Sequence, residues 1–212
     1  MIKILLVDDH DLVRMGVRRL IEDIEGFEVS GEVATGEAAI HFSANEQVDV
    51  ILMDLNMPGI GGLEATRRLV LKQPNLKIIA LTMLDSEPFP QQLFKAGAMG
   101  YLTKGCHIDE IKHAVKEVYF GRRYVSVEIA QKMALKIQPG SNNPFDDLSQ
   151  REMQVMMMIM QGMKNQQISD RLVLSPKTIS TYRYRLFNKL GIKSDIDLLQ
   201  LARRYGLLEE TV

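Results

Sequence analysis

The chain has 212 residues, of which 46% are hydrophobic and 25% are charged, with a formal net charge of −1. This composition is typical of a soluble globular protein with one large domain or two ordinary ones. A single cysteine, Cys106, excludes an internal disulfide, and no apolar run approaches the roughly 18 residues that a membrane helix needs. Asp8 and Asp9 interrupt the first apolar run, so we expect no signal peptide, no membrane partner and a cytoplasmic location.

Over the first 120 residues, apolar segments of strand length alternate with amphipathic segments of helical spacing. The predicted strands are 2–7, 28–33, 48–53, 76–81 and 99–102. The predicted helices are 11–24, 36–44, 62–72, 90–98 and 107–120. Regular β–α alternation with nearly continuous apolar strands predicts an α/β fold, a doubly wound five-stranded parallel sheet.

Polar side chains follow four of these strands at the point where each strand ends: Asp8 and Asp9, Asp54, Thr82 and Lys104. The carboxyl ends of parallel strands share one edge of a sheet, so we expect these side chains to converge there. Close carboxylates repel each other by about 4 kcal/mol per pair at an effective dielectric constant of 20. A divalent cation would compensate this repulsion, and Mg²⁺ suits such a site because it binds oxygen ligands and leaves positions for water and phosphate.

Each of these residues also has a simpler interpretation. A single Asp after a strand usually serves a turn or a helix cap, and a single Lys in a loop is usually solvated. The recurrence of such residues at successive strand ends is harder to explain in that way, so we favour a shared site.

At these positions the sequence resembles the receiver domain of two-component response regulators, through the motifs VDDH, MDLNMPGIGG, LT and YLTKG. The resemblance covers residues 1–120 and implies the strand order 2-1-3-4-5. It also implies that Asp54 accepts a phosphoryl group from the phosphohistidine of a sensor histidine kinase, in a Mg²⁺-dependent reaction.

The same resemblance implies a role for each polar residue of the site. The groups that hold Mg²⁺ would be Asp9, Asp54, the backbone carbonyl of Asn56 and, assisting, Asp8. The groups that contact the phosphoryl oxygens would be Lys104 and Thr82. Tyr101 would occupy the aromatic switch position, for which a half-buried strand aromatic is the simpler interpretation.

Beyond residue 120 the β–α rhythm stops. Residues 121–146 are predicted to be a linker, with one helix over 126–137 and many turn formers over 138–147. The last part, 147–212, has the capping signals of four short helices, at Ser149–Gly162, 165–172, Ser175–Leu190 and Ser194–Gly206. The many methionines of the first of these helices are interpreted as core packing rather than as metal ligands.

Two helices joined by a short turn indicate a helix-turn-helix domain. Residues 141–212 hold 10 Lys and Arg against 8 Asp and Glu, and residues 171–194 hold six basic residues and no acid. This charge favours a polyanionic partner, with a solvated helix face as the alternative. The expected DNA contacts lie on the third helix and are Lys177, Thr178, Ser180, Thr181, Arg183, Tyr184, Arg185 and Lys189. Arg183 borders the apolar stripe, so its stem alternatively covers apolar surface.

This segment resembles the LuxR-type helix-turn-helix domain over residues 145–208, through LSQRE, ISDRLVLSPKTIS and LFNKLGIKS. The whole chain is similar to the NarL/FixJ class of response regulators, and most similar to the GacA/UvrY branch. That class implies a transcription regulator rather than an enzyme. It implies binding to double-stranded promoter DNA as a phosphorylation-dependent homodimer.

Three alternatives remain open from the residues themselves. A phosphohydrolase could use Asp54 as its nucleophile, but no second acid follows it two residues on. A small-molecule-sensing LuxR protein would need an apolar pocket domain, which the carboxylate cluster argues against. A regulator that works without phosphorylation is disfavoured, because the chain has the complete set of groups of the expected phosphorylation site: the acids, the hydroxyl and the ammonium.

Overall fold

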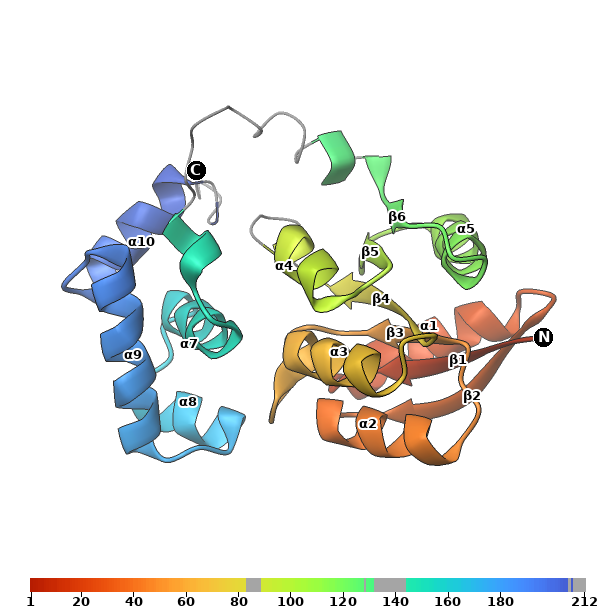
Figure 1. Cartoon of the computed structure of the whole chain (residues 1–212), viewed down its shortest axis with the longest axis horizontal. Coiled ribbons are helices and arrows are strands. Elements are labelled where there is room, and N and C mark those ends of the chain that lie inside the picture. The colour runs from red at the N-terminus through yellow and green to blue at the C-terminus, as the bar shows by residue number, and fades with distance from the viewer. Residues whose placement is uncertain (83–88, 128, 132–143, 206, 208–212) are drawn as a thin grey trace. The chain divides into compact units, whose positions relative to one another are not determined.

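The computed structural model describes residues 1–82, 89–127, 129–131, 144–205 and 207. These residues form two compact units, one up to residue 131 and one from residue 144 onward (Figure 1). None of the described helices has the length and apolarity that a bilayer crossing requires.

The first unit contains a parallel sheet of six strands in the order β2-β1-β3-β4-β5-β6. Its strands are β1 (Ile2–Val7), β2 (Phe27–Val33), β3 (Val50–Met53), β4 (Lys77–Thr82), β5 (Gly100–Thr103) and β6 (Tyr124–Val125). Its helices are α1 (Asp11–Glu22), α2 (Gly36–Asn45), α3 (Gly61–Lys72), α4 (Phe89–Ala96) and α5 (Ile108–Tyr119). The predicted α/β fold and the order of its first five strands are confirmed.

Both faces of this sheet are covered, which explains why the strands are continuously apolar. Along β1, Ile4 and Leu6 face one core together with residues of α1 and α5. Leu5 and Val7 face the opposite core, together with residues of α2 and α3. The helices therefore lie on the two faces of the sheet (Figure 1).

The first unit continues past residue 120, where the sequence predicted a linker. Strand β6 pairs with β5 through Gly100↔Tyr124 and Tyr101↔Val125, and residues 127 and 129–131 are helical. The sequence did not predict this sixth strand. The remainder of the predicted linker helix and the start of the turn-rich segment fall in 132–143, outside the described residues.

The second unit is a small helical bundle. Its elements are the 3₁₀ helix η1 (Pro144–Asp147) and the helices α7 (Gln150–Met160), α8 (Asn165–Leu172), α9 (Pro176–Leu190) and α10 (Asp195–Arg204). Helix α7 starts with the predicted capping box, in which the backbone N–H of Ser149 donates to Glu152 Oε2 at 2.7 Å. Helix α9 has Ser175 as its N-cap and ends at Gly191 in the left-handed conformation, both as predicted. Gly206 lies outside the described residues.

Packing in the second unit centres on α7 and α9. The buried side chains of α7 include Met153, Met156 and Met158, so the methionine-rich run fills the core as interpreted. Ile179 and Leu186 of α9 are fully buried against it. Between α8 and α9, Val173 adopts φ 54° and is 77% exposed, which is a strained conformation for a β-branched residue.

Candidate functional site

The carboxyl ends of β1, β3 and β5 bring together acids and a lysine that are distant in sequence. Asp8 follows β1, Asp54 follows β3 and Lys104 follows β5. Strands β1 and β3 are direct neighbours in register, with Val7 opposite Met53. The backbone N–H of Asp54 donates to the Val7 carbonyl at 2.8 Å, which continues the ladder and fixes the two acids side by side.

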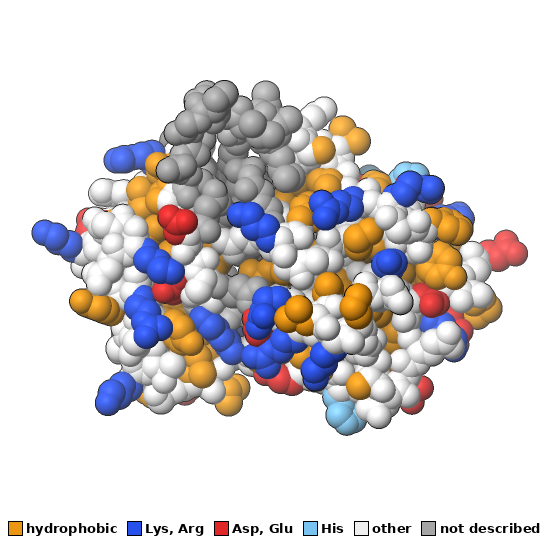
Figure 2. Space-filling view, viewed as in Figure 1, with side chains coloured by type: hydrophobic (Ala, Val, Ile, Leu, Met, Phe, Trp, Pro, Cys, Tyr) orange, Lys and Arg blue, Asp and Glu red, His pale blue; other side chains and the backbone are white. Residues whose placement is uncertain are grey.

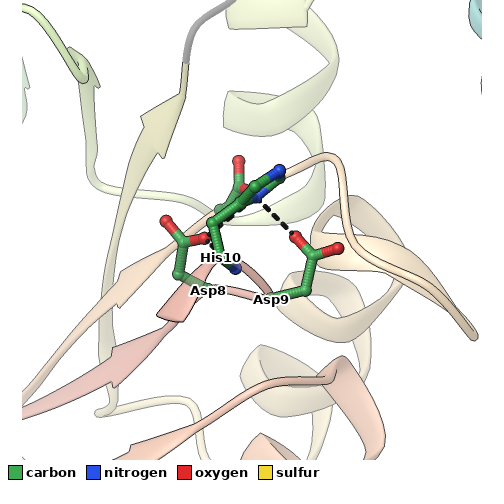
Figure 3. A group of neighbouring side chains, drawn as sticks. Asp8, Asp9 and His10 are labelled. Atoms are coloured by element: carbon green, nitrogen blue, oxygen red, sulfur yellow. Dashed lines mark hydrogen bonds and ion pairs between the residues drawn. The ribbon is translucent and has the colours of Figure 1, made fainter. Parts of the chain in front are cut away.

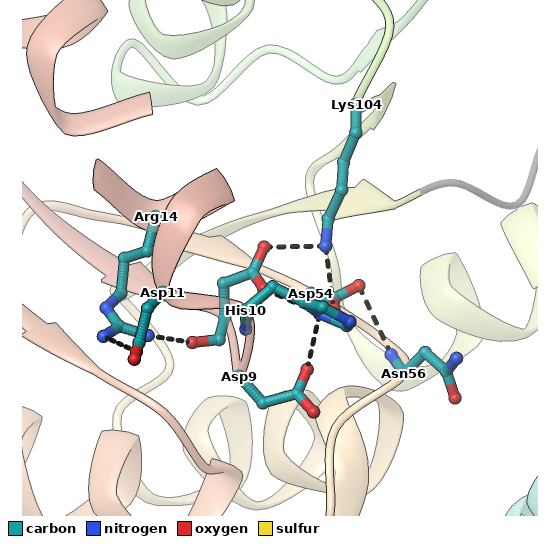
Figure 4. Close-up of polar contacts among 8 residues, drawn as sticks. Asp9, His10, Asp11, Arg14, Asp54, Asn56 and Lys104 are labelled. Carbon is teal, nitrogen blue, oxygen red and sulfur yellow. Dashed lines mark hydrogen bonds and ion pairs between the residues drawn. The ribbon is translucent and has the colours of Figure 1, made fainter. Parts of the chain in front are cut away.

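Lys104 bridges two of these carboxylates (Figure 4). Its Nζ lies 2.7 Å from Asp8 Oδ2 and 2.9 Å from Asp54 Oδ2. The side chains of Lys104, Asp8 and Asp54 are 7%, 9% and 3% exposed, so these charges interact in a largely dry environment. The predicted convergence of Asp8, Asp54 and Lys104 is therefore seen in the structure.

Burial raises the pKa of the Asp54 carboxyl above its ordinary value, and the neighbouring Asp8 adds to this shift. The ammonium of Lys104 opposes the shift without cancelling it. For Lys104, burial by itself lowers the pKa, but the hydrogen bonds to Asp8 and Asp54 and their charges outweigh it, so its pKa is raised. The charged form of Lys104 is thus favoured, and the Asp54 carboxyl has less positive charge around it than its burial requires.

Asp9 and His10 complete the cluster (Figure 3). His10 Nδ1 lies 3.1 Å from Asp9 Oδ1 and 3.4 Å from Asp8 Oδ1. Taken one per residue, ligand atoms of Asp8, Asp9, His10 and Asp54 all lie within 4.8 Å of one another. The sequence predicted the three acids but not His10, although its position next to the acidic pair was a signal.

The loop after β1 is fastened by Arg14 of α1. Its guanidinium donates to the backbone carbonyl of Asp8 at 2.6 Å and to Asp11 Oδ1 at 2.5 Å. Its Nε lies 3.5 Å from Glu32 Oε2 on β2. Arg14 therefore ties the backbone of Asp8 to α1 and β2.

The loop after β3 is held from two sides. Its Asn56 backbone N–H donates to Asp54 Oδ1 at 3.3 Å. Further along, Glu37 of α2 accepts a hydrogen bond from the backbone N–H of Ile60 at 2.9 Å, just before α3. A Cβ on Gly59, which has φ 74°, would meet that same carboxylate at 2.5 Å. The Asp54 loop is thus fixed at its start by Asn56 and at its end by Glu37.

The two remaining predicted residues of the site lie at the ends of β4 and β5. Thr82 is the last residue of β4 and stands opposite Thr103 of β5, but its side chain lies outside the described part. Tyr101 of β5 is fully buried rather than half-buried.

The second predicted site is the polar face of α9. Lys177, Ser180, Thr181, Tyr184 and Arg185 are exposed, and Thr178 is partly so. Lys177 and Arg185 have no ion-pair partner among the described residues. Lys and Arg side chains are spread over the surface where α9 and α10 lie, with few acidic ones between them (Figure 2).

Two basic residues of α9 that were predicted to contact DNA have partners within the unit. Arg183 hydrogen-bonds to Asn165 Oδ1 at 3.2 Å, pairs with Asp195 and lies over the ring of Phe187. Lys189 Nζ lies 2.7 Å from Glu152 Oε2 and 2.9 Å from the Asp147 carbonyl. A phosphate contact by either residue would have to compete with these partners.

The sequence matches two family models. Residues 4–116 match the response regulator receiver domain, and residues 146–202 match the bacterial regulatory proteins of the luxR family. The two matched segments correspond to the two units of the structure.

Relatives and solved structures agree with these matches over nearly the whole chain. The response regulator GacA of Pseudomonas aeruginosa is 51% identical over 211 residues, 99% of each chain. The response regulator UvrY of Escherichia coli is 51% identical over 209 residues, 98% of this chain and 96% of its own. RcsB from Salmonella enterica serovar Typhimurium, bound to promoter rprA in the presence of phosphomimetic BeF₃⁻, is 26% identical with a TM-score of 0.70 and covers 96% of this chain and 99% of that one.

Proposed function

We propose that this chain, which belongs to the two-component response regulators with a receiver domain and a LuxR-type DNA-binding domain, is switched by phosphorylation of Asp54. One observation carries the proposal. The Asp54 carboxylate is almost fully buried and lies 2.9 Å from the ammonium of Lys104, at the carboxyl ends of the strands. A phosphoryl group on Asp54 would have a fixed cation beside it.

The proposed transfer uses Asp54 as nucleophile. A carboxylate oxygen of Asp54 attacks phosphorus, the new P–O bond forms, and the P–N bond to the histidine of a sensor kinase breaks. The electron pair of that bond returns to the imidazole nitrogen, which takes up a proton. Because phosphoryl transfer requires mainly positioning and charge neutralisation, the Asn56 N–H and the Lys104 ammonium are suited to hold the acceptor. The phosphoryl group stays on Asp54 of the protein itself, so we propose that the chain is not an enzyme acting on a separate substrate.

We propose Mg²⁺ as the cofactor, because the donor set fits this ion. Carboxylate oxygens of Asp8, Asp9 and Asp54 lie within 4.8 Å of one another, and the Lys104 ammonium contacts those of Asp8 and Asp54. Oxygen ligands are those that Mg²⁺ prefers. The groups that would hold it are Asp9, Asp54 and the backbone carbonyl of Asn56, with Asp8 assisting. Bound Mg²⁺ would neutralise charge on the phosphoryl oxygens.

The phosphoryl group would then act as a local electrostatic switch. It adds about 1.5 to 2 negative charges and three acceptor oxygens. Lys104 and Thr82 would turn toward these oxygens and move the ends of β5 and β4. The buried Tyr101 of β5 would serve as the switch aromatic. Changing a two-state equilibrium from 1:99 to 99:1 requires about 5.5 kcal/mol. A few charge-assisted contacts of about 1.5–3 kcal/mol each are sufficient.

The proposed output is binding of double-stranded promoter DNA by α9. The N-terminal half of the helix, from Lys177 to Tyr184, would meet base edges, and Arg185 would contact phosphate. We propose that phosphorylation releases this domain and favours a homodimer on inverted half-sites. Access to both a kinase phosphohistidine and DNA implies a cytoplasmic location.

The test compares wild type with Asp54→Asn and with Asp109→Asn, an exposed acid on α5 that serves as the control. Each protein is incubated with Mg²⁺ and a small phosphodonor, and its intact mass is measured. We expect one added phosphoryl group on wild type and on the control, and none on Asp54→Asn. An unmodified wild type under conditions that preserve acyl phosphates would overturn the proposal.

A further inference from the structure

His10 is an imidazole within a cluster of carboxylates (Figures 3 and 4). Its Nδ1 faces Asp9 Oδ1 at 3.1 Å and Asp8 Oδ1 at 3.4 Å. The proposed function gives this side chain no role.

The backbone around His10 holds this residue next to the acidic pair. His10 stands immediately before α1, at the N-cap position, where its side chain makes no capping hydrogen bond. Its backbone N–H instead donates to Asp8 Oδ1 at 2.8 Å, which fixes the residue over the acidic pair. The ring is 57% exposed, so rotating it toward a bound ion would disturb little packing.

The spacing of these groups fits one ion. Two ligands on opposite sides of a metal, each about 2.1 Å from it, are about 4.2 Å apart. Single ligand atoms of Asp8, Asp9, Asp54 and His10 already lie within 4.8 Å of one another. Small side-chain rotations would therefore place the imidazole nitrogen and the carboxylate oxygens around the same ion.

We propose that His10 is a further metal ligand of this site, so that the receiver domain also binds a divalent transition metal of the imidazole-preferring class, such as Ni²⁺ or Zn²⁺. This inference rests on the metal site of the proposed function. Imidazole nitrogen is a good ligand for Ni²⁺ and Zn²⁺, whereas Mg²⁺ is held by oxygen and water. Removing the imidazole should therefore lower the affinity for Ni²⁺ and leave the affinity for Mg²⁺ nearly unchanged.

The test is calorimetric titration of the tag-free, full-length protein with Ni²⁺ and separately with Mg²⁺, at one fixed pH. The variants are His10→Asn and His10→Ala. His107→Asn is the matched control, because His107 is also an exposed N-cap histidine without a side-chain cap bond, at the start of α5. Mutating a group that only hydrogen-bonds to a metal ligand typically changes metal affinity by about 10–100-fold. Loss of a ligand itself should therefore weaken Ni²⁺ binding by about tenfold or more.

The inference stands if both His10 variants lose this affinity for Ni²⁺, keep the wild-type affinity for Mg²⁺ within about twofold, and His107→Asn binds both ions like wild type. Unchanged Ni²⁺ binding in the His10 variants overturns it. An equal loss for both ions overturns it as well, because His10 would then shape the acidic cluster without selecting the metal. Failure of wild type to bind Mg²⁺ would instead contradict the metal requirement of the proposed function, a result distinct from the first two.

Discussion

Gly62 lies so close to Asp54 that a Cβ atom on residue 62 would stand 1.9 Å from the Asp54 carbonyl oxygen. The Gly62 N–H also donates to the carbonyl of Leu55 at 3.2 Å. Helix α3 therefore begins in contact with the backbone that carries the proposed phosphoryl acceptor. Only a residue without a side chain allows this approach.

We expect Gly62→Ala to destabilise the receiver domain by about 1–3 kcal/mol, because the backbone after Asp54 must move away from the new methyl group. Phosphorylation of Asp54 by a small donor should be slower for the same reason. Urea denaturation and intact-mass kinetics measure the two effects. Gly16→Ala in α1 is the control, since a Cβ there meets nothing within 4 Å, and it should be neutral or slightly stabilising. Equal effects of the two substitutions would contradict the steric explanation.

The raised pKa of Asp54 predicts a specific dependence of stability on pH. The folded protein keeps the Asp54 proton to higher pH than the unfolded chain, so the contribution of Asp54 to the unfolding free energy falls as pH rises above about 4. Without metal, Asp54→Asn should therefore be more stable than wild type at pH 7, and the difference should shrink toward pH 4. Urea denaturation in the presence of a chelator, at several pH values, measures this.

The same carboxylate should make the stability of wild type depend on Mg²⁺. A ligand that binds the folded state raises its stability in proportion to the logarithm of its concentration above the dissociation constant. We expect added Mg²⁺ to raise the melting temperature of wild type more than that of Asp54→Asn.

For the pH prediction, the contradicting outcome concerns the metal-free proteins. An Asp54→Asn protein that is less stable than wild type at pH 7 would contradict the conclusion that burial raises the pKa of Asp54.

Arg183 and Arg185, two residues apart on α9, should respond differently to truncation. Arg183→Ala removes the contacts to Asn165 and Asp195, so it should lower the melting temperature of the second unit. Arg185→Ala should leave that temperature unchanged, weaken DNA binding, and reduce the slope of log affinity against log salt by about one. Calorimetry and salt-dependent DNA binding separate the two outcomes. An Arg183→Ala protein of normal stability with a reduced salt slope would show that Arg183 leaves its partners for DNA.

Val173 is predicted to be a site of removable strain. Its left-handed backbone conformation is unfavourable for a β-branched side chain, and its exposure means that little packing is lost on replacement. Val173→Asn should stabilise the second unit by about 1 kcal/mol, because Asn tolerates this conformation. Val173→Ile keeps the strain and should bring no gain. Hydrogen exchange of the α8 and α9 amides in the full chain measures the local free energy.

The fold and much of the site were predictable because they depend on simple regularities. Continuous apolar runs predicted the first five strands. The shared carboxyl edge of a parallel sheet, together with the strand order that the resemblance implied, predicted that Asp8, Asp54 and Lys104 would lie near one another. The capping signals at Ser149 and Ser175 predicted where α7 and α9 begin. Strand β6 escaped prediction because its two residues, Tyr124 and Val125, are too few to form a recognisable apolar run.

What the sequence could not supply was the partner of each side chain. The helical periodicity of α9 predicted that Arg183 lies beside the apolar stripe. Its partners Asn165 and Asp195 belong to neighbouring helices, and sequence periodicity does not show how helices pack against one another. The His10 ring faces Asp9 and Asp8 across the loop after β1, a contact that its neighbours in sequence did not indicate. The convergence of the acids and Lys104 was therefore predictable, whereas the place of His10 in the cluster and the atoms that face one another were not.

The contacts of Lys189 close one end of the second unit. Its ammonium joins the C-terminal end of α9 to the Asp147 carbonyl of η1 and to Glu152 in the first turn of α7. Three elements therefore share one cation at the end of α9 opposite Lys177. The packing contacts of Lys189 and the proposed base contacts, which begin at Lys177, thus use opposite ends of the same helix.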